Sequence, residues 1–326
     1  MTTARIVSLS ELGNADVIKL IDKELPAPGK GEVQLRQTAI GFNFIDVYQR
    51  SGVYPLELPT GLGHEAVGVV EALGEGVTRF KVGDRVMYMN AGIGAYASAR
   101  NVAVDKLVSV PDNVSDESAA AVFFKAMTAQ YLIQKTYKVK SGDVVLVHAA
   151  AGGVGQILAG WAKSLGAFVV GSVGSEGKFA AAKAAGCDAV VDYSSPNWVE
   201  EFMKATGGRK ANVVYDSVAK TTFLGSLDCA APFATVALFG AASGPAPEIQ
   251  PEILNKKGCL FLTRPSVFPH NATPELLQEN ARAVFDAIAE GRVKVQIGAK
   301  FPLEQAAEAH KAAEGRKVSG AIVITP

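Results

Sequence analysis

Cysteine is scarce in this chain of 326 residues, which holds only Cys187, Cys229 and Cys259. The three are odd in number, lie far apart and form no CxxC pair. They therefore provide neither a disulfide framework nor a structural zinc site of four cysteines. A chain without a disulfide framework is typical of a reducing compartment, so we expect a cytoplasmic protein.

An excess of one charge is also missing, because 32 Lys and Arg residues balance 32 Asp and Glu residues without a long block of either sign. Nucleic-acid and acidic-membrane partners usually require a basic face, so we expect neither. No basic stretch followed by an apolar run opens the chain, and we expect no secretory leader.

The longest run without formal charge, residues 144–161, approaches the length of a membrane span. However, His148, Gln156 and four glycines interrupt it, and a turn signal lies in its middle. A buried strand followed by a buried helix explains this run better than a membrane span.

Two patterns of apolar residues divide the chain into two parts. Residues 1–125 contain short apolar strands separated by glycine, proline and charged turns, which predicts a β-barrel-like unit. From residue 126, short apolar runs alternate with amphipathic helices, which predicts a parallel sheet with helices on both faces. The run CLFLTRP, residues 259–265, is expected to be a further buried strand, and a long helix follows over 273–291. The fold class is therefore α/β.

A glycine-rich turn, HAAAGGVGQ, joins the first strand of the alternating region to its first helix. Gly152 and Gly153 would let the backbone approach a pyrophosphate at the helix N-terminus, and Gly155 would allow the helix to pack closely on the strand. Ala150 replaces the first glycine of the G-x-G-x-x-G pattern. The alternative is a tight turn that binds no ligand.

The end of the next strand indicates which dinucleotide would bind. An NAD enzyme has an Asp or Glu here to hold the ribose 2′-hydroxyl, and Val173 occupies that position. Ser175, Lys178 and Tyr193 instead provide hydroxyls and an ammonium group, which suit a 2′-phosphate. The sequence therefore predicts NADPH, although Lys178 could be an ordinary surface lysine and Glu176 could simply cap a helix.

His64, followed by Glu65, is a candidate zinc ligand just before an apolar strand. A catalytic zinc needs three protein ligands and an open position, yet no cysteine precedes Cys187. The other histidines, His148, His270 and His310, are expected on a buried strand end, a loop and a late helix, without HxxxH or HxH spacing. We therefore expect no metal and a structural role for His64.

Several linked motifs carry a resemblance that runs from end to end: AIGFNFIDVYQRSGVYP, FFKAMTAQYL, HAAAGGVG, GSVGSEGK, VVYDSV, LFGAASG and LTRPS. On these motifs the chain resembles the medium-chain dehydrogenases/reductases, and among them the zinc-free NADPH:quinone oxidoreductases of the ζ-crystallin type. Zinc-dependent members would have cysteine ligands at Asn43 and near Phe124. Only His64 matches the ligands of those members, although zinc-free members tend to have a small polar residue there.

The resemblance implies a GroES-like catalytic domain of residues 1–125 and 270–326, and an inserted Rossmann domain of residues 126–269. It also implies that the nicotinamide lies in the cleft between them, and that a homodimer forms through the edge strands of the Rossmann domains. The residues that it assigns to the cofactor are Asn43, Asp46, Tyr48, Thr128, Gly152, Gly153, Val154, Gly174, Ser175, Lys178, Tyr193, Phe239, Gly240, Arg264, Ser266 and Arg316.

The predicted activity is hydride transfer from NADPH to a quinone, with Asn43, Tyr48 and Tyr54 as candidates to bind the acceptor oxygen. The cofactor would carry the reducing chemistry, and a quinone needs no Lewis acid because its reduced oxygen is a stabilised aromatic oxyanion. Three alternatives stay open. They are a zinc-free reductase of α,β-unsaturated carbonyls, a zinc alcohol dehydrogenase, and a non-catalytic protein that binds NADPH or RNA.

Overall fold

A computed structural model describes residues 2–294, 296–315, 318 and 320–326. Their contacts group into two compact units. Unit 1 comprises Met1–Phe124, Asn271–Phe285 and Val295–Pro326, and unit 2 comprises Lys125–His270 and Asp286–Lys294. The predicted domain boundaries, 125/126 and 269/270, stay our proposal. The contacts differ from them by assigning Lys125, His270 and residues 286–294 to unit 2.

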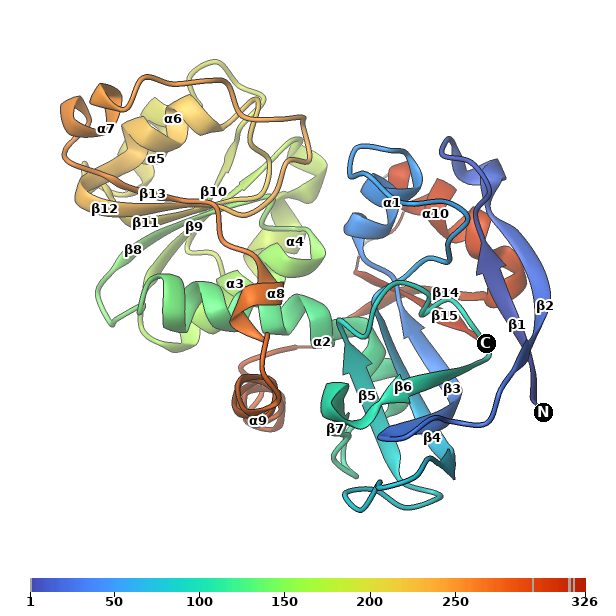
Figure 1. Cartoon of the computed structure of the whole chain (residues 1–326). Coiled ribbons are helices and arrows are strands. Elements are labelled where there is room, and N and C mark those ends of the chain that lie inside the picture. The colour runs from blue at the N-terminus through green and yellow to red at the C-terminus, as the bar shows by residue number, and fades with distance from the viewer. Residues whose placement is uncertain (1, 295, 316–317, 319) are drawn as a thin grey trace. The chain divides into compact units, whose positions relative to one another are not determined.

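Unit 1 is built mainly from strands (Figure 1). A two-stranded antiparallel sheet pairs β1, Thr2–Ser8, with β2, Lys19–Leu25. The larger sheet has the order β14-β15-β3-β4-β5-β7, with β6 also paired to β3. Its strands are β3 (Glu32–Gly41), β4 (Glu65–Leu73), β5 (Arg85–Met89), β6 (Ala99–Ala103), β7 (Leu107–Ser109), β14 (Ile297–Pro302) and β15 (Ala321–Thr325).

The chain end completes unit 1, because β15 pairs with β3 through Val323↔Gly41 and Ile324↔Ile40. Side chains of these strands form one core, in which Leu35, Ile40 and Ile324 are fully buried. Consecutive residues of β15 are buried, because the strand is covered on both faces. Helices α1 (Phe44–Arg50) and α10 (Ala306–Glu314) also belong to unit 1.

Unit 2 is a parallel six-stranded sheet in the order β10-β9-β8-β11-β12-β13. The strands are β8 (Val144–His148), β9 (Phe168–Val173), β10 (Ala189–Asp192), β11 (Ala211–Asp216), β12 (Ala230–Leu238) and β13 (Phe261–Thr263). In chain order this is 3-2-1-4-5-6, the order of dinucleotide-binding sheets.

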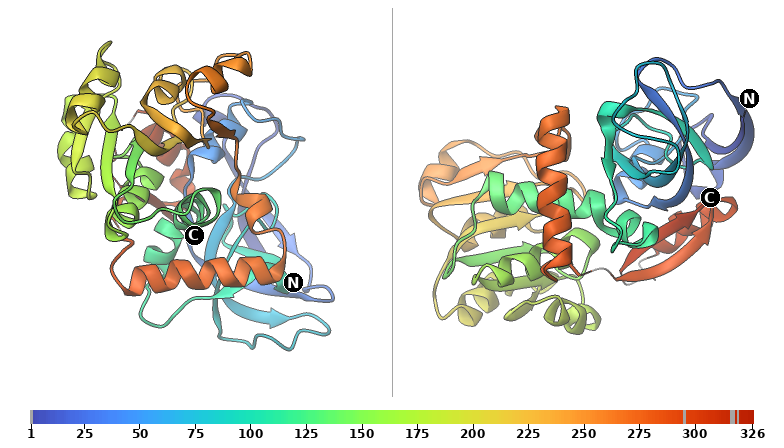
Figure 2. Two further views of the ribbon diagram at one scale, coloured as in Figure 1. Left: turned by 90° about the vertical axis from the view of Figure 1, so that its left-hand side faces the viewer. Right: turned by 90° about the horizontal axis from the view of Figure 1, so that it is seen from below.

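Helices cover both faces of this sheet, as predicted: α3 and α4 lie on one face and α5 and α6 on the other (Figure 1). Their bounds are α3 (Gly153–Ser164), α4 (Phe179–Ala184), α5 (Trp198–Ala205) and α6 (Phe223–Cys229), and two short helices follow, α7 (Glu252–Lys256) and α8 (Val267–His270). The predicted long helix is α9, Pro274–Ala289, which Figure 2 shows as one straight helix.

Two sequence predictions differ from the structure. The strand β13 is not buried, because Phe261 is 62% exposed and lies on the sheet edge, with β12 as its one neighbour in the sheet order. An apolar composition predicts that a strand is buried, but it does not distinguish a central strand from an edge strand. His270 ends helix α8 rather than lying in a loop.

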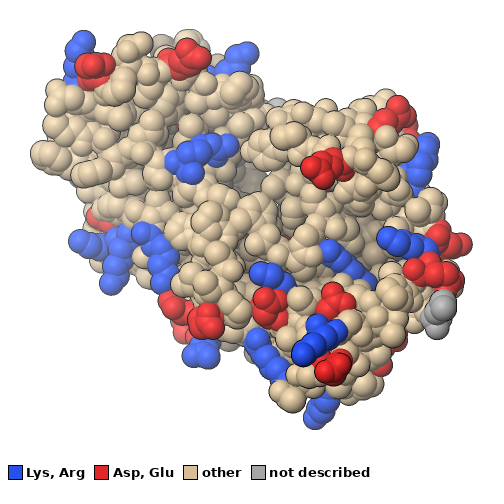
Figure 3. Space-filling view, in the orientation of Figure 1, with Lys and Arg blue, Asp and Glu red and all other residues tan. Residues whose placement is uncertain are grey.

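The uncharged run over residues 144–161 forms strand β8, the glycine turn and most of helix α3, as expected. Within the described residues, no helix is both long enough and apolar enough to cross a membrane. Figure 3 shows basic and acidic side chains interspersed on the face that it presents, in keeping with the balanced charge count.

Candidate active site

The candidate cofactor residues of unit 2 gather at one edge of the sheet. Its strands end at His148, Val173, Asp192, Asp216, Leu238 and Thr263. Predicted residues lie within the first six positions after five of these ends: 152–154, 174, 175, 178, 193, 239, 240, 264 and 266. Parallel strands present their carboxyl ends at the same edge, where open α/β sheets bind ligands.

The glycine turn after β8 is tightly constrained. Ala149 adopts a positive φ of 51°, and its carbonyl accepts a hydrogen bond from the Gly152 amide at 2.8 Å. A Cβ atom on Gly155 would lie 2.2 Å from that same carbonyl oxygen, so only glycine fits without moving the turn. The prediction that Gly155 permits close packing is therefore confirmed. Gly152 is exposed at the N-terminus of α3, where amide groups favour an anion.

The end of β9 has no carboxylate at the position of the ribose-binding acid. Val173 is 1% exposed, and its carbonyl accepts the Tyr193 amide at 2.9 Å. A Cβ atom on Gly174 would lie 2.7 Å from the Tyr193 hydroxyl, so these two residues touch. Ser175 is exposed and precedes a short 3-10 helix that ends at Lys178. The structure thus brings the four predicted phosphate-binding residues to two adjacent strand ends.

The neighbouring strand β10 ends at Asp192, and the turn that follows donates hydrogen bonds to the Asp192 carboxylate. The Asp192 Oδ1 atom accepts both the amide of Ser194 at 2.8 Å and its hydroxyl at 2.7 Å. This carboxylate therefore caps a turn, which leaves a 2′-phosphate as the better match for the nearby hydroxyls and lysine.

The ends of β12 and β13 also converge. Arg264 Nη1 donates to the Leu238 carbonyl at 2.8 Å, directly beside Phe239. A Cβ atom on Gly240 would lie 2.5 Å from the carbonyl oxygen of Ser217, which follows β11. Ser217 was not predicted, although the motif VVYDSV contains it, because the motif does not show which of its residues reaches the edge.

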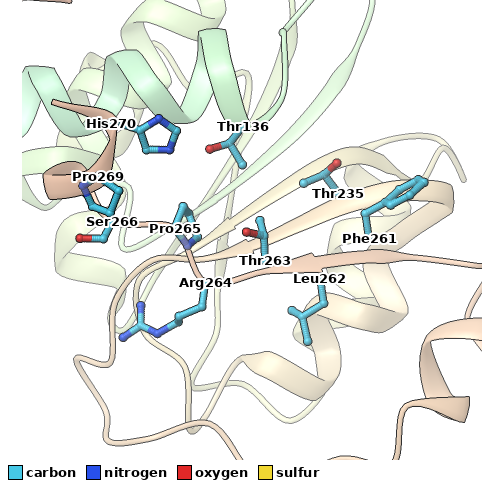
Figure 4. Close-up of a pocket in the computed structure, with 10 residues that line it drawn as sticks. All are labelled: Thr136, Thr235, Phe261, Leu262, Thr263, Arg264, Pro265, Ser266, Pro269 and His270. Atoms are coloured by element: carbon cyan, nitrogen blue, oxygen red, sulfur yellow. The ribbon is translucent and has the colours of Figure 1, made fainter. Parts of the chain in front are cut away.

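A pocket of about 630 Å³ lies beside these strand ends in unit 2 (Figure 4). Arg264 and Ser266 line it together with Phe261, Leu262 and His270. His270 stacks on the ring of Tyr131 with the centroids 4.4 Å apart. The pocket thus joins two predicted cofactor residues to the exposed edge strand β13.

The predicted residues of unit 1 surround helix α1. Asn43 precedes the helix, and its backbone amide donates to Asp46 Oδ2 at 2.9 Å. Asp46 is fully buried and also accepts the Tyr96 hydroxyl at 3.0 Å. The rings of Tyr48 and Tyr54 lie 5.3 Å apart, each half-buried. The structure therefore brings Asn43, Asp46 and the two tyrosines together.

Comparison with known proteins agrees with this arrangement. Residues 29–112 match the family "Alcohol dehydrogenase GroES-like domain", and residues 153–293 match "Zinc-binding dehydrogenase". A quinone oxidoreductase of Pseudomonas aeruginosa is 44% identical over 324 residues, which cover 99% of this chain and 100% of the relative. A 2-haloacrylate reductase of a Burkholderia species is 42% identical, over 96% of each chain.

A solved structure of Escherichia coli quinone oxidoreductase complexed with NADPH superposes with a TM-score of 0.95. It is 41% identical, over 99% of this chain and 100% of that one. The chain belongs to the quinone oxidoreductase family. The resemblance, the combination of a GroES-like unit with a Rossmann-type sheet, and the assignment as an oxidoreductase are thus confirmed.

The resemblance places the two cysteine ligands of zinc-dependent members at Asn43 and near Phe124. The Glu65 carboxylate contacts both of them, through Asn43 Nδ2 at 2.7 Å and the Phe124 amide at 2.8 Å. Among the described residues, no three His, Cys, Asp or Glu side chains are grouped to hold a metal ion. The residues present at this position do not fit a catalytic zinc site.

His64 is buried, and its Nε2 atom lies 2.9 Å from Gln49 Oε1. Burial, helped by the positive charge of Arg100, lowers the pKa of His64 from 6.5 to about 4. The ring is therefore neutral at pH 7, and as the Nε2–H tautomer it donates to Gln49.

We expect His64 to make folding sensitive to acid. Because the pKa is lowered in the folded state, stability is complete above pH 6.5 and falls as the pH decreases toward about 4. Between pH 7 and pH 5 this single group should cost roughly 2 kcal/mol of unfolding free energy. Urea unfolding at both pH values measures this loss. The unfolding free energy of His64→Gln should decrease between pH 7 and pH 5 by about 2 kcal/mol less than that of the wild type. Equal decreases for the variant and the wild type would contradict this assignment.

A buried polar network near the carboxyl edge was missed by the sequence analysis. His148 Nδ1 lies 2.5 Å from Ser172 Oγ, and its Nε2 lies 2.9 Å from Ser226 Oγ. Ser226 in turn donates to Asp216 at 2.8 Å. Burial lowers the pKa of His148, and the Asp216 carboxylate opposes this shift. The network joins β8, β9, β11 and α6, which no local sequence pattern reveals.

Three predicted cofactor residues remain to be placed. Thr128 lies on α2, Asp116–Tyr131, and is 7% exposed. Val154 is the second residue of α3 and is half-buried. Arg316 lies outside the described residues.

Proposed function

We propose that this protein reduces quinones by hydride transfer from NADPH and does so without zinc. The observation that carries the proposal is the carboxyl edge of unit 2, where Ser175, Lys178 and Tyr193 surround a strand end that lacks the ribose-binding acid. The solved structure of the E. coli relative with NADPH supports the same cofactor.

The glycine turn would hold the pyrophosphate, because residues 152 and 153 place no side chains at the start of α3, where helix amides favour an anion. Gly174, Ser175, Lys178 and Tyr193 would surround the adenosine phosphate. Along the nicotinamide we place Phe239, Gly240, Arg264 and Ser266 from unit 2, and Asn43, Asp46 and Tyr48 from unit 1. When bound, NADPH supplies the hydride, and the protein supplies position.

Asn43, Tyr48 and Tyr54 would bind the acceptor oxygen. A quinone that gains a hydride and one proton becomes a hydroquinone, and NADPH leaves as NADP⁺. The oxygen that accumulates charge is a stabilised aromatic oxyanion, so hydrogen bonds from an amide or phenol suffice and the final proton can come from water. Zinc independence rests on Asn43 and Phe124, which replace two ligands, and on Glu65, which contacts both of them.

A second candidate activity is the reduction of α,β-unsaturated carbonyl compounds, favoured by the 42% identity to a 2-haloacrylate reductase. NADPH oxidation with 1,4-benzoquinone, 2-chloroacrylate and 2-cyclohexenone distinguishes the two. We expect kcat/KM for the quinone to exceed both others. A higher value for chloroacrylate or cyclohexenone would assign the second activity instead.

We also propose a cytoplasmic homodimer that forms through strand β13. Phe261, Leu262 and Phe233 are 62%, 36% and 70% exposed on or beside this edge strand. Unpaired edge strands with apolar side chains are ready to pair with a second copy.

The change Phe261→Glu should shift the protein from dimer to monomer, because it places a charge in the apolar contact. Light scattering coupled to size-exclusion chromatography measures the mass, with the exposed Leu224→Glu on helix α6 as the matched control. A wild-type monomer, or a dimer that persists in Phe261→Glu, would contradict the proposed interface.

A further inference from the structure

The Glu65 carboxylate joins two distant parts of unit 1. Its Oε1 atom accepts Asn43 Nδ2 at 2.7 Å, and its Oε2 atom accepts the Phe124 amide at 2.8 Å. Glu65 is fully buried, while Asn43 and Phe124 are 5% and 8% exposed. Two oxygens that each accept an N–H group suit an ionised carboxylate, which has no proton to donate.

The backbone around Glu65 is shaped for this carboxylate. Gly41 pairs with Glu65 across strands β3 and β4. A Cβ atom on Gly41 would lie 2.3 Å from Glu65 Oε1 and 2.3 Å from the Ala120 carbonyl oxygen. A side chain at residue 41 would therefore displace the carboxylate, and glycine leaves it room.

The bond to Glu65 turns the Asn43 side-chain amide. An ionised carboxylate only accepts hydrogen bonds, so the NH₂ group of Asn43 faces Glu65 and its carbonyl oxygen lies on the side of the Asp46 backbone amide. One N–H of the NH₂ group bonds to Glu65, and the second would be the donor to the acceptor oxygen. Rotation of the amide by 180° would place two acceptors against each other inside the protein, and buried unmatched acceptors are costly.

We infer that Glu65 is a positioning residue that fixes the orientation of the Asn43 amide for the reaction. This inference rests on the proposed function, in which Asn43 lies beside the nicotinamide and the acceptor. Glu65 acts through Asn43, which it holds by one of its two hydrogen bonds while the other fixes it to the Phe124 amide.

The isosteric change Glu65→Gln tests this role. The Gln oxygen can still accept the Phe124 amide, but its NH₂ group then faces Asn43 and requires the Asn43 carbonyl to turn toward it. The variant should fold and bind NADPH with a Kd within about threefold of the wild type, while kcat falls about ten- to hundredfold, the usual loss for a hydrogen bond to a charged group.

A double-mutant cycle with Asn43→Ala separates positioning from a general structural role. If Glu65 acts through Asn43, Glu65→Gln adds less than about threefold to the kcat loss of Asn43→Ala. Losses that multiply in the double variant would overturn the inference. Glu71→Gln is the matched control, since Glu71 lies on the same strand, is exposed, and pairs with Arg36 on the surface. It should leave kcat unchanged.

Should Glu65→Gln alone not fold, the exchange Asn43→Asp with Glu65→Gln restores the donor and acceptor in reversed order. A folded exchange variant would show that residue 65 acts through its hydrogen bond to residue 43. An exchange variant as unfolded as Glu65→Gln would show an independent structural role and overturn the inference. The cycle uses the acceptor that the wild type reduces fastest, so absence of quinone turnover in the wild type counts against the proposed function alone.

Discussion

Replacement of Gly155 by alanine is expected to weaken NADPH binding about five- to hundredfold, through a steric conflict costing about 1–3 kcal/mol. The new Cβ atom would lie 2.2 Å from the Ala149 carbonyl oxygen and 2.8 Å from the Ala150 Cα atom. Both atoms are backbone, so no flexible side chain can move aside. Either the turn or the start of helix α3 has to shift, and both carry the amides proposed to face the pyrophosphate.

Fluorescence titration with NADPH measures this change, and Gly160→Ala is its matched control. Gly160 lies farther along the same helix, where a Cβ atom would approach the Ala185 carbonyl oxygen only to 3.1 Å. We expect Gly160→Ala to keep the wild-type affinity for NADPH. An affinity of Gly155→Ala equal to that of the wild type would show that the cofactor does not bind over this turn.

Lys178→Ala is expected to reduce the preference for NADPH over NADH about ten- to hundredfold, the range for one hydrogen bond between charged groups. Lys178 ends the 3-10 helix after β9, close to the Gly174–Tyr193 contact. A 2′-phosphate would lose its ammonium partner, whereas NADH has no phosphate at that position.

The ratio of kcat/KM for the two cofactors measures this preference. Lys183→Ala is a suitable control, because Lys183 lies on the adjacent helix α4 and donates to the Asp188 carbonyl. A ratio that is unchanged in Lys178→Ala would contradict the proposed phosphate site. Equal losses with NADPH and NADH would place Lys178 at another part of the cofactor.

Local sequence signals were sufficient for much of the fold. The change from period-two strands to alternating strands and helices near residue 126 reflects which face of each element is buried, and this is a property of neighbouring residues. The role of Gly155 was also predictable, because a strand, a tight turn and a helix follow one another within nine residues. The resemblance of the linked motifs added the discontinuous unit 1, in which the chain end pairs with β3.

Long-range relationships were not predictable. The Glu65 bonds to Asn43 and Phe124 span 22 and 59 residues, and the His148 bond to Ser226 spans 78. Such contacts depend on sheet order, which local patterning does not encode. The exposure of β13 was missed for a similar reason, because an apolar edge strand and an apolar central strand have the same composition.

The most direct test of the central claim follows NADPH oxidation with 1,4-benzoquinone, in an untreated sample and in one treated with a chelator. The account predicts equal turnover in both, because Asn43 and Phe124 supply no metal ligands and Glu65 bonds to both of them. Turnover that disappears with the chelator and returns with added zinc would contradict it and make His64 a candidate ligand. Absence of turnover in both samples would contradict the assignment of quinones as the acceptor.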